Sequence, residues 1–278
     1  MNFYRSEKVT GTVTAIYSLT GEILYLVEGE KEAVLIDTCI GIGHLRDFVE
    51  WLTAKPLRVL LTHGHVDHAM GAPEFERVYL NLRDRELYQR QSSLEERRGY
   101  LRAGLGEAAD QWKESDFVPQ ERDKEFLPLS DGMVFALGGV TIEAYEMPGH
   151  TKGSMVFLIR EEGILILGDA CNNSTFLFDQ DSSSVEEYRE TVRRTKERLE
   201  GSYRRVFLSH HVRETDPQIM ENMIGVCGDV LAGEADDLPF SFMGRQAYIA
   251  KRCNERFERE DGKSGNLIYS RERVRGSL

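Results

Sequence analysis

Four potential metal ligands stand close together between residues 63 and 68 of this chain. They are His63, His65, Asp67 and His68, in the pattern His-x-His-x-Asp-His. Alternate side chains of an extended segment point to the same side, so His63 and His65 face one way and a turn at Asp67 swings two further groups beside them. Imidazole and carboxylate are ligands that zinc, iron and manganese accept. The spacing therefore predicts a metal centre.

Three later segments carry further candidate ligands. His150 stands in a Pro-Gly-His-Thr run, Asp169 follows a glycine, and His210 follows a serine. Together with the first motif they use five of the seven histidines in the chain, and so few histidines are not expected to fall in these positions by chance. His211 is an alternative ligand to His210, whereas His44 is expected to be an ordinary solvated residue.

The order of these motifs resembles that of the metallo-β-lactamase superfamily, in its glyoxalase II-like and lactonase-like branch. The resemblance covers roughly residues 9–212. It implies an α/β fold, a four-layer αββα sandwich with the metal site along the edge where strands end. It also implies the ligands: His63, His65 and His150 for one ion, Asp67, His68 and His210 for the other, and Asp169 as the bridge.

The resemblance implies two divalent metal ions, first of all zinc, with iron or manganese as alternatives. Two ions that share a water lower its pKa toward neutrality and so generate a hydroxide nucleophile. Asp67 would orient this hydroxide and take up its proton, which makes Asp67 the predicted catalytic residue. Asp37 looks like the family's early aspartate, which supports the metal-binding loop from behind, although Asp37 could instead cap a turn.

The implied activity is a metal-dependent hydrolase that uses a metal-bridging hydroxide on a small-molecule thioester, lactone or ester. The β-lactamases themselves replace the bridging aspartate, so Asp169 argues against that activity. Phosphodiester or phosphonate hydrolysis is an alternative, because the same nucleophile suits an in-line displacement. A mononuclear iron oxygenase that resembles persulfide dioxygenases is another, and a binding module without catalysis is a third. Metal content would separate these hypotheses.

The predicted ligands follow the ends of apolar strands. Residues 57–61 form a buried-type strand that leads into the first motif, residues 164–167 lead to Asp169, and residues 205–209 lead to His210. The other strands are predicted at residues 9–18, 22–27, 33–36, 133–137, 140–146, 155–159 and 267–270. Helices are predicted at residues 43–53, behind the capping box Ser184–Glu187, and from Asp216.

Two regions lie outside the resemblance. Residues 83–126, approximately, are charged and favour helices, which predicts a helical insert that acts as a lid. Its Tyr88, Tyr100 and Trp112 either close over substrate or pack the helices. The C-terminal extension, about residues 215–278, is predicted to hold helix and strand. Its aromatic residues Phe240, Phe242 and Tyr248 either line the pocket or pack a C-terminal helix on the core. Its cationic residues Arg245, Lys251 and Arg252 either contact substrate or form a solvated face.

The composition is that of one globular domain over residues 1–278, with 41% hydrophobic and 29% charged residues. A formal net charge of −12 disfavours nucleic acid and anionic membranes as partners and leaves a small-molecule substrate, with a homo-oligomer open. No signal peptide or long apolar run is evident, which predicts a cytoplasmic protein. The four cysteines lack a CxxC spacing and are expected to be reduced, buried thiols, of which Cys171 stands nearest a predicted ligand.

Overall fold

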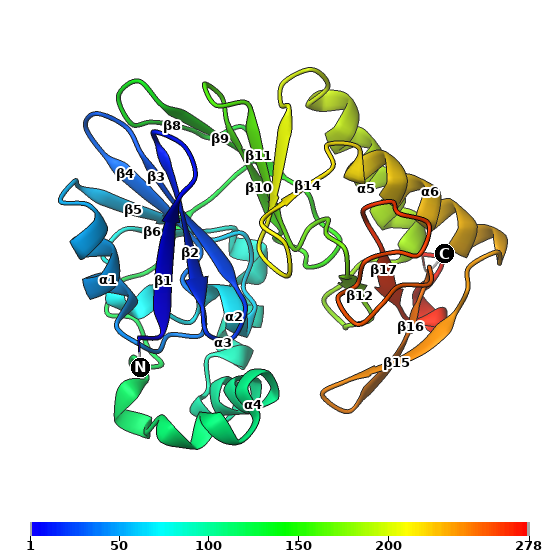
Figure 1. The fold of residues 1–278 in the computed structure, drawn as a ribbon, viewed down its shortest axis with the longest axis horizontal. Coiled ribbons are helices and arrows are strands. Elements are labelled where there is room, and N and C mark those ends of the chain that lie inside the picture. The colour runs from blue at the N-terminus through cyan, green and yellow to red at the C-terminus, as the bar shows by residue number, and fades with distance from the viewer. Residues whose placement is uncertain (1, 277–278) are drawn as a thin grey trace. The chain divides into compact units, whose positions relative to one another are not determined.

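The computed structural model describes residues 2–276 and divides into two compact units, one up to Ala144 and one from Tyr145 (Figure 1). Each unit has its own cluster of buried apolar side chains.

The first unit is built on a seven-stranded sheet whose strands lie in chain order. β1 to β4 pair antiparallel and β4 to β7 pair parallel. A parallel pair needs a crossover, and α1 (Leu45–Leu52) supplies it between β4 and β5. The strands are β1 (Tyr4–Lys8), β2 (Val13–Ser18), β3 (Ile23–Glu28), β4 (Ala33–Ile36), β5 (Leu57–Leu60), β6 (Val78–Leu80) and β7 (Leu127–Pro128).

The predicted insert is helical, as expected. It contains α3 (Arg85–Gln91) and α4 (Leu94–Leu105), followed by the 3-10 segments Gly106–Gln111 and Glu114–Asp116. Short 3-10 turns also occur at Ala72–Glu74 and Leu82–Asp84. The unit is completed by the short helix α2 (Val66–Ala69) and by β8 (Val134–Ala136), which pairs with β9 (Thr141–Glu146), the strand in which the second unit begins.

One buried arginine fastens the insert to the first unit. Arg97 of α4 is only 2% exposed, and burial lowers its pKa to about 10. Its guanidinium donates to the backbone carbonyls of Ile40, Gly41 and Val118, at 2.9, 2.6 and 2.8 Å. A planar group with five donors suits three separate acceptors, so this one side chain satisfies carbonyls that would otherwise lack donors.

The second unit contains two sheets. In the first, the strands lie in the order β14-β13-β11-β10, where β11 and β13 are parallel and α5 lies between them in sequence. These strands are β10 (Met155–Ile159), β11 (Ile164–Gly168), β13 (Arg205–Leu208) and β14 (Glu214–Thr215). In the second, the order is β12-β17-β16-β15, from β12 (Thr175–Leu177), β15 (Leu238–Phe242), β16 (Arg245–Ile249) and β17 (Leu267–Tyr269).

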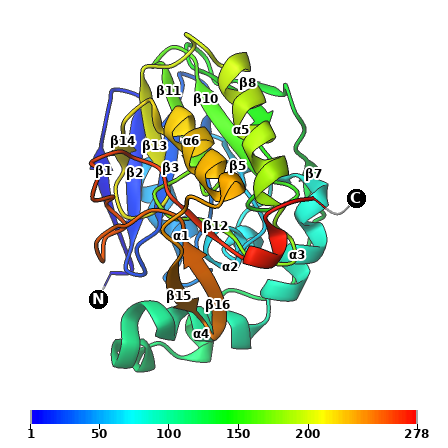
Figure 2. The same cartoon turned by 90° about the vertical axis from the view of Figure 1, so that its right-hand side faces the viewer.

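Two helices of 14 residues each, α5 (Val185–Arg198) and α6 (Ile219–Ala232), pack side by side in both views (Figures 1 and 2). The predicted capping box is present: Ser184 accepts from the backbone N–H of Glu187, whose carboxylate accepts from the backbone N–H of Ser184. The inward stripe of α5 includes Val185, Tyr188 and Val192, all completely buried. A 3-10 turn at Arg271–Arg273 is the last regular element of the described residues.

Most predicted strands and helices are confirmed within a few residues, but β1, β6, β7, β12, β14 and the β15–β16 hairpin were not predicted. The alternative in which the C-terminal aromatic residues pack a helix on the core holds for Tyr248, which packs against the core cluster that includes α6, but not for Phe240 and Phe242. Phe240 and Phe242 lie on β15, where Leu238, Phe240 and Phe242 alternate with more exposed residues, and the hairpin turns at Met243 and Gly244. That alternation has the period of a strand. The single-domain assignment stays a prediction.

All four cysteines are free thiols, as expected, and three are buried while Cys253 is partly exposed. Burial raises the pKa of Cys171 to about 12, so this thiol behaves as a core side chain and not as a nucleophile. Among residues 2–276, no helix combines the length and apolar content needed to cross a bilayer.

Candidate metal centre

The first four predicted ligands lie in the first unit, just after β5, and are called here the N-terminal ligand set. The ring centroids of His63 and His65 lie 4.8 Å apart, and those of His63 and His68 lie 4.2 Å apart. Asp67 Oδ2 lies 3.5 Å from His68 Nε2. The structure thus brings all four side chains together at the end of one strand.

A glycine is required within this motif. A Cβ on Gly64 would lie 2.8 Å from the carbonyl oxygen of Asp84, which is too close for any other residue. The close approach also lets the Asp84 carboxylate accept from the backbone N–H of Gly64 at 3.0 Å. Packing against Asp84, at the start of the insert, therefore requires a glycine between His63 and His65 and holds its backbone in place.

Asp37 holds the N-terminal ligand set from behind, as the sequence predicts. Its side chain is almost completely buried and accepts from His68 Nδ1 at 2.8 Å and from the Thr62 hydroxyl at 2.8 and 2.9 Å. Because a carboxylate only accepts, His68 Nδ1 carries the hydrogen and Nε2 presents its lone pair. The Thr62 hydroxyl lies 3.0 Å from His63 Nδ1 and so supports a second ring. This is how proteins orient metal-binding histidines.

A tyrosine of the insert contacts the predicted catalytic residue. The Tyr100 hydroxyl of α4 lies 3.0 Å from Asp67 Oδ2 and 2.9 Å from Glu22 Oε1, so these two carboxylate oxygens share its single hydrogen. Burial raises the pKa of Tyr100 well above its ordinary value, so the phenol stays neutral and remains a donor. Of the three aromatic residues proposed to close over substrate, Tyr100 alone is shown touching a predicted ligand. Tyr88 packs edge-on to Phe126 and Trp112 packs edge-on to Phe3.

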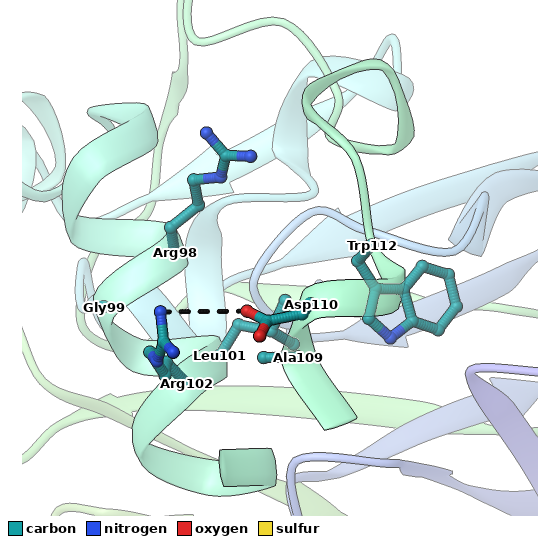
Figure 3. Close-up of a pocket in the computed structure, with 7 residues that line it drawn as sticks. All are labelled: Arg98, Gly99, Leu101, Arg102, Ala109, Asp110 and Trp112. Carbon is teal, nitrogen blue, oxygen red and sulfur yellow. Dashed lines mark ion pairs between the residues drawn. The ribbon is translucent and has the colours of Figure 1, made fainter. Parts of the chain in front are cut away.

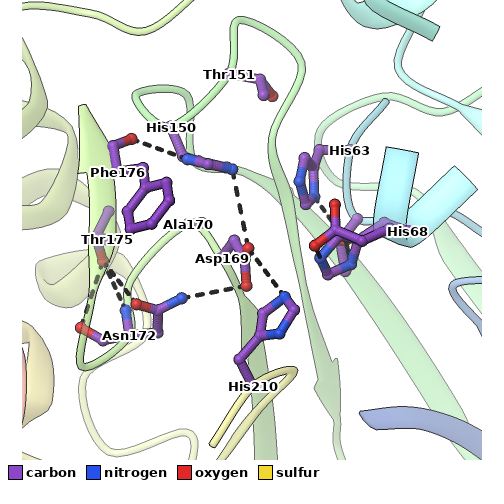
Figure 4. A network of polar contacts seen from close by, with 12 residues as sticks. His63, His68, His150, Thr151, Asp169, Ala170, Asn172, Thr175, Phe176 and His210 are labelled. Carbon is purple, nitrogen blue, oxygen red and sulfur yellow. Dashed lines mark hydrogen bonds and ion pairs between the residues drawn. The ribbon is translucent and has the colours of Figure 1, made fainter. Parts of the chain in front are cut away.

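The other three predicted ligands, His150, Asp169 and His210, lie in the second unit and are called here the C-terminal ligand set (Figure 4). His150 Nδ1 lies 2.9 Å from the carbonyl oxygen of Phe176 on β12. Since a carbonyl only accepts, Nδ1 carries the hydrogen and Nε2 is the nitrogen open to a ligand. The preceding Gly149 is required by packing, because a Cβ there would lie 2.3 Å from the Tyr188 ring.

Asp169 lies close to both histidines of this set, His210 and His150. Its Oδ2 is 3.3 Å from His210 Nε2 and 3.9 Å from His150 Nε2. Asn172 donates to Oδ1 at 3.1 Å, and Figure 4 shows this amide and the His210 ring directed at the same carboxylate. His211, the alternative ligand, turns away to Ser174, 3.2 Å from its Nε2, and has a left-handed φ of 61°. This geometry favours His210 over His211.

The chemistry of these groups fits divalent metal ions. Each ligand set offers imidazole nitrogens and carboxylate oxygens, and His68 and His150 have tautomers that leave Nε2 unprotonated. Ligand atoms of His63 and His65 lie within 4.8 Å of each other, as do those of Asp67 and His68 and those of Asp169 and His210. Divalent metal binding by both sets is therefore chemically sound.

The insert contains a cavity of about 390 Å³ that none of the predicted ligands lines (Figure 3). Its walls come from α4 and the following 3-10 segment, and Arg102 pairs there with Asp110 at 3.7 Å. Of the three aromatic residues singled out in the insert, Trp112 lines this cavity. No predicted ligand lines this cavity, so we interpret it as a gap in the packing of the insert and not as the substrate site.

Comparison with known proteins identifies the family. The sequence profile of the metallo-beta-lactamase superfamily matches residues 24–200, well over half of the chain. The chain belongs to the metallo-β-lactamase superfamily. A metallo-beta-lactamase from Pontibacter korlensis has the same fold, with a TM-score of 0.52 and 20% identity over 80% of this chain and 97% of that one. The predicted αββα fold class and the assignment to a superfamily of metal-dependent hydrolases are thereby confirmed.

Two relatives of this superfamily member are named thioesterases. The acyl-coenzyme A thioesterase MBLAC2 of Bos taurus is 26% identical over 67% of this chain and 72% of its own length. An atrochrysone carboxyl ACP thioesterase of Aspergillus terreus is 27% identical over 58% of this chain and 42% of its own. The chain spans about two fifths of the length of the fungal relatives that it matches.

Sequence reasoning missed the groups that hold the ligands in place. Phe176, Asn172 and Glu22 were not singled out, and Tyr100 was named only as one of three aromatic residues in the insert. Phe176 acts through its backbone carbonyl, which carries no residue-specific signal. Asn172 alone had a signal that could have been used, because it stands three residues after Asp169.

Proposed function

We propose that this chain is a dinuclear metal-dependent thioesterase, with His63, His65 and His150 at one ion, Asp67, His68 and His210 at the other, and Asp169 between the two. The observation that carries the proposal is the way each ligand set is held. Asp37 and the Phe176 carbonyl accept hydrogen bonds from Nδ1 of His68 and of His150, respectively. Both histidines therefore keep Nε2 unprotonated and available to a metal ion, as is usual for metal-binding histidines. Zinc is the first expectation for both ions.

The substrate class is proposed from the relatives. The bovine and the Aspergillus terreus proteins are both named thioesterases, although their acyl groups and carriers differ. An acyl thioester is therefore the substrate that this superfamily member is expected to share with them, ahead of a lactone or an oxygen ester. Phosphodiester hydrolysis and iron-dependent oxygenation stay as the alternatives that the experiment must separate.

The chain's own residues would orient the water and move its proton. When bound, the ions would supply Lewis-acid chemistry that makes water a competent nucleophile near neutral pH. Asp67 is the proton acceptor, and the Tyr100 hydroxyl on Oδ2 fixes the direction of its carboxylate. Asn172 on Oδ1 of Asp169 does the same for the bridging carboxylate.

The test is metal analysis of the purified protein together with a panel of acyl thioesters, lactones, phosphodiesters and β-lactams. We expect two zinc ions per chain and the highest kcat/KM for a thioester. His65→Ala should lower thioester kcat/KM by more than about 100-fold, because loss of a ligand exceeds loss of a ligand's support. His44→Asn is the matched control, since His44 is exposed and asparagine tolerates its left-handed φ of 55°.

Three outcomes would overturn the proposal. One iron per chain with oxygen uptake identifies an oxygenase, and preferred cleavage of a phosphodiester identifies a phosphodiesterase. Equal activity of His65→Ala and His44→Asn would remove the metal centre itself from the reaction.

A further inference from the structure

Five phenylalanines of the second unit form a surface outside its hydrophobic core. They are Phe176, Phe178, Phe240, Phe242 and Phe257, called here the aromatic platform. Each is only partly buried, and the core cluster among the described residues of this unit does not include them. Large aromatic side chains left outside a core form a partly exposed apolar patch, and such patches can mark a binding surface.

The platform is continuous. The Phe176 ring lies 4.9 Å from that of Phe178, 5.3 Å from that of Phe242 and 5.9 Å from that of Phe240. Phe240 lies 6.0 Å from Phe257. Phe240 and Phe242 share one face of β15 because alternate residues of a strand point the same way, and that face meets β12. The rings thus pack on one another and leave their outer parts accessible.

The platform adjoins the C-terminal ligand set at two points. The carbonyl of Phe176 accepts from His150 Nδ1 at 2.9 Å, so one platform residue also orients a predicted ligand. At the other end, the Phe257 ring lies 5.0 Å from that of His211, the residue after His210. An apolar group lying on the platform would therefore lie next to the residues that hold the C-terminal ligands.

The backbone around the platform is strained and fastened. Met243 at the hairpin turn, Phe257 and His211 have φ values of 46°, 58° and 61°, in the left-handed region that these residues rarely adopt. Such strain persists only where surrounding structure imposes it, and it concentrates at functional sites. An ion pair between Arg245 on β16 and Asp179 ties the hairpin to the segment after β12.

We propose that the aromatic platform binds the apolar acyl group of a thioester substrate, either an alkyl chain or an aromatic ring. The inference rests on the proposed function and specifies its substrate: short polar acyl groups would leave the rings uncovered, whereas a long or aromatic acyl group would cover them. The contact is with ring faces and edges, so it selects for apolar area and not for a hydrogen-bond pattern.

The experiment compares acetyl, decanoyl and 2-naphthoyl thioesters of coenzyme A with the zinc-loaded full chain. In Phe242→Ala and Phe240→Ala, kcat/KM for the decanoyl or the naphthoyl thioester should fall roughly tenfold or more, while that for the acetyl thioester changes less than about twofold. Phe242→Leu, which keeps apolar area, should lose less than Phe242→Ala. Ser241→Ala, on the opposite and exposed face of β15, is the matched control.

The outcomes are decisive in either direction. A loss confined to the decanoyl arm identifies an alkyl chain and a loss confined to the naphthoyl arm identifies a ring, and both support the platform. Equal losses for acetyl and long acyl groups, or no loss in either phenylalanine variant, would overturn it.

Calorimetric binding of decanoate and 2-naphthoate separates this inference from the proposed function. Binding to the wild type that is weakened by Phe242→Ala supports the platform even if thioesters are not hydrolysed. Absence of binding together with unchanged acyl selectivity would sink the platform while leaving the hydrolase intact.

Discussion

The two ligand sets differ in how the chain assembles them. The N-terminal set comes from one short stretch after β5 and is backed by a buried carboxylate, Asp37, and by the Thr62 hydroxyl. The C-terminal set comes from three separate segments, and its supports are neutral: the Phe176 carbonyl and the Asn172 amide. One set is thus held by a negative charge and the other by dipoles.

This difference predicts unequal sensitivity to mutation. A carboxylate behind a ligand raises its basicity and adds a negative charge that attracts the cation, whereas a neutral carbonyl raises basicity less and an amide donor mainly orients its partner. Changes behind the N-terminal set should therefore alter metal affinity, and changes behind the C-terminal set should alter mainly geometry.

Asp37→Asn should have the largest effect of the variants that leave every ligand in place. Asparagine accommodates the φ of 65° at this position but removes the charge behind His68. We expect zinc affinity to fall about 10- to 100-fold, measured by competition with a chromophoric chelator. Unchanged affinity would show that the charge is irrelevant and that the two sets are held in equivalent ways.

Tyr100→Phe should have an intermediate effect, because it removes the hydrogen bond to Asp67 Oδ2 without changing any ligand. We expect kcat to fall about tenfold with little change in KM, as a hydrogen bond to a charged group is worth about 1.5–3 kcal/mol. The measurement is steady-state kinetics over a range of pH.

Tyr88→Phe is the matched control for that variant. Tyr88 is also a buried tyrosine of the insert, but its hydroxyl has no hydrogen-bond partner in the part of the chain that the structure describes. Its activity should equal that of the wild type and its thermal midpoint should be equal or higher. Equal losses in both variants would mean that insert packing, and not the Asp67 contact, is responsible.

Asn172→Ala should have the smallest effect on the reaction. Of the two oxygens of Asp169, the Asn172 amide donates to Oδ1, whereas Oδ2 is the oxygen nearest His210. The Asn172 side-chain oxygen also accepts from the backbone N–H of Ser174. We expect kcat/KM to fall by less than about fivefold and zinc affinity to stay within about twofold, by the same kinetic and competition assays. A loss of zinc affinity as large as in Asp37→Asn would remove the distinction between charged and neutral supports.

The same contrast explains what the sequence could predict. His63, His65, Asp67 and His68 form a compact pattern, and apolar strands lead into it, so both the pattern and its place in the fold could be recognised. His150, Asp169 and His210 were found through the family's motif order. The supports could not be found in this way, because Tyr100 lies 33 residues from Asp67 and Phe176 lies 26 residues from His150.

The fold was predictable for similar reasons. The buried strands that precede the ligands, such as β5 and β11, have continuous apolar or strongly alternating patterns. The β15–β16 hairpin has a mixed pattern with Pro239 and two phenylalanines, and it is recognised by the antiparallel pairing of its two strands and by the pairing of β16 with β17. Its role depends on tertiary contacts that no local pattern encodes.

The Arg97 anchor has a consequence for engineering this enzyme family. Excising the insert to shorten the protein would strip donors from the carbonyls of Ile40 and Gly41, in the loop that follows Asp37. Grafting the insert onto a relative would bring a buried cation into a scaffold whose loop must supply the same carbonyl acceptors. The insert therefore cannot be exchanged alone between relatives. The loop that contains Ile40 and Gly41 would have to be transferred together with it.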